Sequence, residues 1–185
     1  MKILKKRFFA LILAVIIVLG ASMVSVHTKL NKEFSQVSDD FYNGVEVNGE
    51  RDISIHSQLI QIGRVCEDIV AVADRYGIDV GEFKDNVDYF NYDILVMDGN
   101  ISYIHYLYEE LLDDIMEAVT KINSVELSKA DEQITVNALE NILQAKDNIE
   151  NSAYNERVRK YISSLPFLMD FFADITGAYL PEYFA

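Results

Sequence analysis

The chain has 185 residues, one cysteine and a formal net charge of −14 at neutral pH. A single cysteine cannot form an internal disulfide, which excludes a small secreted scaffold held together by disulfides. An acidic surface repels phosphate, so a nucleic-acid partner is not expected. The charge is uneven: residues 1–30 hold five basic and no acidic side chains, whereas the remainder holds 11 basic and 30 acidic ones.

The first 27 residues have the pattern of a membrane anchor. A basic cap, Lys2–Arg7, precedes Phe8–Val26, a run of nineteen residues without a charge. A helix of roughly 20 apolar residues is long enough to cross the hydrocarbon core of a bilayer. We therefore expect a basic cap and transmembrane helix in residues 1–27, followed by an acidic domain in residues 28–185. The alternative is a cleaved signal peptide with its cut near Leu19–Ala21, because small residues stand at that point.

The basic cap also predicts the orientation of the anchor. Lys5, Lys6 and Arg7 lie directly before the apolar run, and basic flanks of transmembrane helices stay on the cytoplasmic side. We expect a single-pass protein of the cell membrane with its C-terminal domain on the outer side.

A helical pattern continues directly from the anchor. Its apolar residues recur at spacings of four and three: Leu30, Phe34, Val37 and Phe41. No proline or glycine stands between them, so one long helix is predicted to run from the anchor to about Tyr42 and to couple anchor and domain rigidly. Asn43–Arg51 contains two Asn-Gly-type breaks and is predicted to be a loop.

A second helix is predicted after this loop, with Asp52 or Ser54 as its N-cap and Gly77 as its C-cap. Its apolar seam comprises Leu59, Ile62, Cys66, Ile69, Ala73 and Tyr76. The stretch Val80–Val96 is less regular and is predicted to contain one short helix, and the turn residues at 98–100 end it.

The third and fourth helices are the most regular. The third is predicted from the seam Ile101, Ile104, Tyr108, Leu111, Ile115, Val119 and Ile122, which suits coiled-coil-like packing. The fourth is predicted to begin at a capping box, Ser128–Asp131, and to run without interruption towards Tyr161 until Pro166 ends or bends it. Its predicted seam is Ile134, Ala138, Ile142, Ala145, Ile149 and Ala153.

These elements predict an all-α fold. Long helices with one apolar seam each, joined by short connections, pack as an antiparallel bundle. The expected architecture is an N-terminal transmembrane helix that continues into an antiparallel bundle of about four long helices, with an apolar, aromatic C-terminal tail at residues 165–185.

Seven short segments form a recognisable set: Phe34–Val37, Leu127–Ala130, Leu139–Leu143, Glu150, Tyr154–Tyr161, Leu165–Phe167 and Glu182–Phe184. Together these segments resemble the LemA family. The most specific of them are the Tyr-Asn pair at Tyr154 and Asn155 and the Tyr-Phe ending at Tyr183 and Phe184. The resemblance implies an N-terminal membrane helix and a helical bundle, and it supplies no reaction.

The chain departs from the family pattern at three places. Asn151–Ala153 stands where relatives have arginines, Asp170–Gly177 replaces a glycine-rich tail, and the Asn43–Arg51 loop resembles an insertion. Relatives are also described with a cytoplasmic domain, whereas the basic cap of this chain predicts an outer one.

One group of side chains is a candidate for binding metal. Glu110, Asp113, Asp114 and Glu117 share a helix face beside Glu109, and carboxylate oxygens suit Ca²⁺ or Mg²⁺. The alternative is the solvent face of an amphipathic helix, which we favour, so no metal site is assigned.

No constellation in the sequence predicts catalysis. His27, His56 and His105 are the only histidines, and none follows a glutamate by three residues as a di-iron bundle site requires. Cys66 is flanked by Glu67 and Asp68, which oppose formation of a thiolate, and it lies on an apolar seam. No cofactor and no enzymatic activity are expected.

The sequence therefore predicts a membrane-anchored interaction or scaffolding protein. Its partners would be the membrane, through the N-terminal helix, and other proteins, through the bundle faces or the aromatic tail, since exposed apolar patches mark such sites. The alternative is a binding or sensor domain at the membrane that responds to divalent cations through residues 109–117.

Overall fold

A computed structural model describes residues 2–96, 101–164 and 183–184; the side chains of residues 2–16, 18, 19 and 164 lie outside this description. The described residues form α1 (Lys2–Asn43), β1 (Glu46–Val47), β2 (Glu50–Arg51), α2 (Ile55–Tyr76), α3 (Phe83–Val96), α4 (Ile101–Ile122), α5 (Lys129–Glu150) and α6 (Ala153–Ser164). The turn predicted at residues 98–100, the helix end predicted at Pro166 and most of the apolar tail at 165–185 lie outside the described residues.

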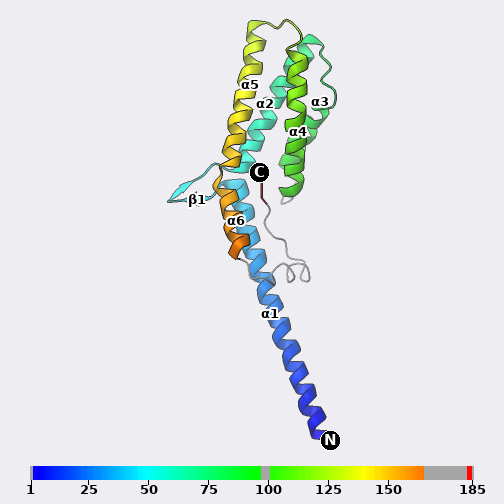
Figure 1. The fold of residues 1–185 in the computed structure, drawn as a ribbon, viewed down its shortest axis with the longest axis vertical. Helices are drawn as coiled ribbons and strands as arrows, with labels where there is room; N and C mark the ends of the chain where they lie inside the picture. Colours follow the sequence, from blue (N-terminus) through cyan, green and yellow to red (C-terminus); the bar gives the residue numbers. More distant parts are fainter. Residues whose placement is uncertain (1, 97–100, 165–182, 185) are drawn as a thin grey trace.

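The helices form an antiparallel bundle extended at one end by a pair of helices. Helices α2, α3, α4 and α5 pack alongside one another, and α6 lies against the C-terminal half of α1 below them (Figure 1). One continuous set of buried apolar residues runs through both parts, from Val37 in α1 to Val158 in α6. The all-α bundle predicted from the apolar seams is confirmed.

Helix α1 is unbroken across the junction between the predicted anchor and the domain. It continues through Val26–Lys32 without interruption, as the uninterrupted pattern predicted. Leu30, Val37 and Phe41 are at most 2% exposed, so the C-terminal third of the helix belongs to the core. The N-terminal half extends away from the other helices (Figure 1).

The residues whose side chains the structure describes include no helix that is both long enough and apolar enough to cross a membrane. Most side chains of the predicted anchor, Phe8–Val26, are outside that description.

The loop between α1 and α2 contains a small hairpin that the sequence did not predict. Strand β1 pairs antiparallel with β2, with Glu46 opposite Arg51 and Val47 opposite Glu50. Asn48 and Gly49 connect the strands with φ of 55° and 86°, the left-handed backbone that a tight hairpin turn of this kind requires. The predicted Asn-Gly-type break is therefore the turn of a hairpin.

Both ends of α2 match the predicted caps. Ser54 accepts a hydrogen bond from the Ser57 N–H, and Gly77, at φ 64°, donates its N–H to the last carbonyls of the helix. Of the two N-cap candidates, Ser54 has this role. Asp52 has a different one, described below.

The prediction of one continuous fourth helix is wrong, because α5 ends at Glu150 and α6 begins at Ala153. The Ser152 N–H bonds the Ile149 carbonyl three residues back, which tightens the last turn of α5. The break shifts the apolar seam by one residue. The buried apolar residues after Ile149 are Tyr154 and Val158, whereas the predicted Ala153 is only partly buried.

The predicted seam of the fourth helix needs one further correction. Ile134 is 37% exposed, whereas Thr135 is 3% exposed. The Thr135 hydroxyl donates to the Asp131 carbonyl within its own helix. This bond satisfies the hydroxyl, so a threonine can occupy the buried face.

Candidate functional site

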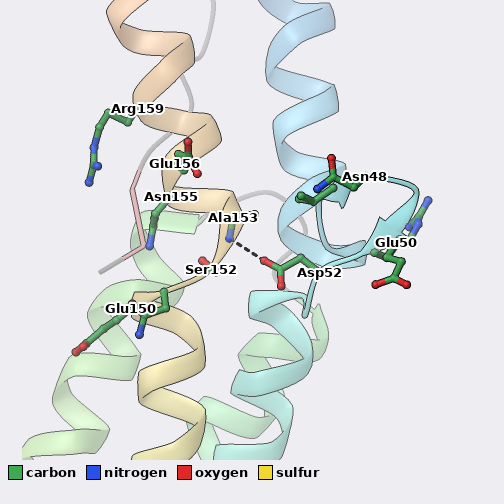
Figure 2. A pocket seen from close by; sticks show the side chains of 12 residues that line it. Asn48, Glu50, Asp52, Glu150, Ser152, Ala153, Asn155, Glu156 and Arg159 are labelled. Atoms are coloured by element: carbon green, nitrogen blue, oxygen red, sulfur yellow. Dashed lines mark hydrogen bonds between the residues drawn. The ribbon is translucent and has the colours of Figure 1, made fainter.

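A groove lies between the hairpin and the break that separates α5 from α6 (Figure 2). Its volume is about 710 Å³. Its lining comprises Val47, Asn48, Glu50, Arg51, Asp52, Glu150, Asn151, Ser152, Ala153, Asn155, Glu156 and Arg159. The hairpin supplies one wall and the first two turns of α6 the other, so this groove depends on the helix break that the periodicity did not predict.

Asp52 joins the two walls. Its Oδ2 accepts a hydrogen bond of 2.7 Å from the Ala153 N–H, the first amide of α6 (Figure 2). A carboxylate at this position satisfies an amide without an intrahelical partner and interacts favourably with the positive end of the helix dipole. Asp52 thus caps a helix 101 residues away in sequence.

Two buried polar side chains lie where α6 begins. Ser152 is 7% exposed, and its hydroxyl has no hydrogen-bond partner in the described part of the chain. Asn155 is 6% exposed and fully engaged: its Nδ2 donates to the Phe184 carbonyl at 2.7 Å, and its Oδ1 accepts the Phe184 N–H at 2.9 Å. The same turn of α6 therefore lines the groove and holds the end of the chain.

Charge along the groove is mixed. Glu50 and Arg51 come from the hairpin, whereas Glu156 and Arg159 come from α6. Lys160 bonds Glu156 at 2.8 Å and lowers the pKa of that carboxyl. No cysteine or histidine lines the groove, so its chemistry is ion pairing and hydrogen bonding.

An aromatic cluster lies behind Asn155. The ring of Phe184 contacts the rings of Phe41, Tyr108 and His105, with centroids 5.4, 5.6 and 4.9 Å away. Tyr154 packs on Phe41 at 5.6 Å. Burial raises the pKa of the Tyr108 hydroxyl well above its ordinary value. The cluster joins α1, α4, α6 and the C-terminus.

One ion pair with a largely buried carboxylate accompanies this cluster. Arg157 Nε lies 2.8 Å from Asp40 Oδ2, and the Asp40 side chain is 11% exposed. Burial raises the pKa of Asp40, and the Arg157 guanidinium partly opposes that shift. The pair connects α1 to α6 below the groove.

The acidic residues considered for metal binding are distributed among separate interactions. Asp114 accepts from Asn86 at 2.7 Å, Glu117 pairs with Lys121 at 2.9 Å, and Glu110 accepts from the Tyr106 hydroxyl. In the described residues, no three His, Cys, Asp or Glu side chains converge as a metal site requires. Glu109 Oε1 lies 3.7 Å from His105 Nε2, and the His105 ring packs on Phe184.

Cys66 lies in the core, as its position on the apolar seam predicted. It is fully buried, and burial raises the pKa of its thiol to about 12. A thiol in this environment is protonated and unreactive at neutral pH.

The sequence indicated some residues of the site but not their arrangement. The Tyr154–Asn155 pair and the Tyr183–Phe184 ending carry the resemblance to a family, and the structure brings Tyr154, Asn155 and Phe184 together. The groove itself had no local signal, because its two walls are about one hundred residues apart.

No family model, curated protein or solved structure matches this chain.

Proposed function

We propose that the protein is a membrane-anchored, non-enzymatic interaction or scaffolding protein, and a divergent relative of the LemA family. The carrying observation is the single helix α1, which is part of the core at Leu30, Val37 and Phe41 and extends beyond the bundle at its other end. A helix built in this way transmits the position of its membrane-facing half directly to the bundle.

Exposed apolar side chains on the extending half support an anchor. Ile17 is 61% exposed and Val24 is 67% exposed, and they belong to the uncharged run Phe8–Val26. Contact with water is unfavourable for such side chains, and lipid would remove it. The basic cap Lys2–Arg7 favours a single-pass arrangement in the cell membrane with the bundle on the outer side.

The proposed family relationship rests on the sequence resemblance. Residues that carry the resemblance in separate segments, Tyr154, Asn155 and Phe184, form one cluster. A shared role in attaching the chain end to the bundle gives these positions a common physical reason.

The membrane role is tested by fractionation at alkaline pH. The full chain is expected to stay with the membrane pellet, whereas a chain lacking residues 2–26 is expected in the supernatant. Loss of about twenty residues from the mature protein, seen as a lower mass, would indicate a cleaved signal peptide and contradict the anchor.

The orientation is tested by adding protease to intact cells. Digestion of the bundle is expected, and protection of the bundle would contradict the outer orientation.

A further inference from the structure

Tyrosines and aliphatic side chains are exposed together on the outer side of α3 and α4. Tyr89, Tyr92 and Leu95 of α3 are 64%, 64% and 74% exposed, and Tyr106 of α4 is 54% exposed. Together with Val96, at 56%, and Tyr103 they form what we call the tyrosine face. Tyrosine is enriched in protein interfaces because it supplies a large, rigid contact area with a polar tip.

Helical spacing aligns the α3 residues of this face, and one hydrogen bond connects it to α4. Tyr89, Tyr92 and Val96 stand at i, i+3 and i+7 along α3 and therefore share one side of that helix. Helices α3 and α4 pack side by side at the edge of the bundle away from α5 (Figure 1). The Tyr103 hydroxyl donates to Asp93 at 3.1 Å, which joins the two helices across the face.

The face has a one-sided charge. Residues 85–120 contain nine acidic side chains and no lysine or arginine. The two lysines of these helices are already paired: Lys84, which lies beside Asp85 and Asp88 at the start of α3, bonds Asp74 at 2.7 Å, and Lys121 near the end of α4 bonds Glu117 at 2.9 Å. A ligand on the tyrosine face therefore meets aromatic rings, the aliphatic side chains of Leu95 and Val96, and carboxylates, and the nearby Lys84 is already paired.

We propose that the tyrosine face docks an arginine- and lysine-rich segment of a partner protein. Guanidinium groups stack on exposed aromatic faces and pair with carboxylates, and both groups are present here. A second copy of the chain would bring two acidic faces together, and like charges oppose that contact. The inference names the partner chemistry of the interaction role proposed above and rests on that role.

The test measures binding of a labelled arginine–serine peptide to the full chain in non-ionic detergent, by fluorescence anisotropy. A citrulline–serine peptide, which keeps the shape and lacks the charge, is the ligand control. Because the protein is in detergent, the result does not depend on whether α1 anchors it in a membrane.

Two pairs of variants test the face. Tyr89→Ser with Tyr92→Ser removes rings, and Asp85→Asn with Asp88→Asn removes charges. Each is expected to weaken binding of the arginine peptide about three- to tenfold, because the first pair removes cation–π partners and the second removes ion-pair partners of the guanidinium groups. All four positions are exposed, so the fold should persist, and circular dichroism checks this.

Matched control variants lie on α5, which has exposed apolar and acidic residues but no aromatic ones. They are Val136→Ser with Leu143→Ser, and Glu132→Gln with Glu140→Gln. These are expected to leave the affinity unchanged. Equal weakening by the α5 variants, equal binding of the citrulline peptide, or no binding at all would overturn the proposal. So would a dimer in sedimentation analysis that the tyrosine variants dissolve, because the occupant would then be a second copy.

Discussion

Asn155 replaces, with one side chain, the two hydrogen bonds that a neighbouring strand would make. Its amide bonds both the N–H and the carbonyl of Phe184 in a region where both residues are buried. A buried backbone group without a partner is costly, and Asn155 supplies the partners of both peptide groups of Phe184. This one residue therefore stabilises the insertion of the Phe184 ring into the aromatic cluster.

Asn155→Ala should lower the free energy of unfolding by about 2–4 kcal/mol, because two hydrogen bonds are lost and buried polar groups are left behind. Urea denaturation followed by circular dichroism measures the change. Asn151→Ala is the matched control: that side chain is exposed and bonds only Asp147 in its own turn, so less than about 1 kcal/mol is expected. Equal losses in the two variants would contradict the role of Asn155.

The sequence indicated these residues without their contact. Resemblance to a family singled out Tyr154, Asn155 and Phe184, but the hydrogen-bonded pair is 29 residues apart. Periodicity reports only which face of a helix is buried. It carries no information on which distant residue satisfies a buried amide.

At the scale of the elements, the sequence predicts a helix cap when the capping side chain and the capped amide are close in sequence. It does not predict a cap when the two are far apart. Ser128 accepts from the Asp131 N–H three residues on, a spacing visible in the sequence. Asp52 is one of the two N-cap candidates that the sequence offers for α2, yet its carboxylate caps α6. The helical spacing of apolar residues also continues from Ile149 to Ala153, so the apolar pattern does not reveal that α5 ends at Glu150.

Asp131 should make stability depend on pH in the acid range. The hydroxyls of Ser128 and Tyr76 and the Arg75 guanidinium bond its carboxylate and lower its pKa. A carboxyl with a lowered folded pKa adds stability above its unfolded pKa, and this contribution is lost as pH falls through the folded pKa. The difference in unfolding free energy between the wild type and Asp131→Asn should therefore be constant near neutrality and shrink below about pH 4.

Urea denaturation across this pH range tests that dependence. Asp113→Asn is the control, since Asp113 is exposed and forms no ion pair or side-chain hydrogen bond with the described residues. Its difference from the wild type should stay small throughout. A difference for Asp131→Asn that persists unchanged in acid would refute an electrostatic origin.

Asp52→Ala should destabilise the protein by about 0.5–2 kcal/mol, the usual effect of removing an N-cap. Asp52→Asn keeps an acceptor and should recover most of that loss. Glu50→Ala, on the same hairpin and exposed, should change stability by less than about 0.5 kcal/mol. Thermal denaturation compares the three. If Asp52→Ala behaved like Glu50→Ala, the bond to Ala153 would contribute nothing to holding the hairpin against α6.

At the scale of the whole molecule, α1 is both a part of the core and the connection to the proposed membrane anchor. Phe41 and Leu30 are buried in the domain, and no break separates them from the extending half of the helix. A continuous helix curves gently but has no flexible joint, so the bundle is expected to keep one distance and direction from the proposed anchor. The sequence predicted this continuity because it depends only on local signals, the absence of proline and glycine and an unbroken seam.

Thr28→Pro should separate the two halves of α1 without unfolding the bundle. Proline at this position has no backbone N–H to donate to the Val24 carbonyl, and its ring clashes with that carbonyl. The bundle should stay folded because Thr28 is exposed. Spin labels on Ser25→Cys and Leu143→Cys, at exposed sites, report the distance between helix and bundle by pulsed electron paramagnetic resonance. Cys66 is buried and should stay unlabelled.

A narrow distance distribution in the parent should broaden in Thr28→Pro and remain narrow in Thr28→Ala. A parent distribution as broad as that of the proline variant would show that the anchor and the bundle move independently, and that α1 does not set the position of the bundle.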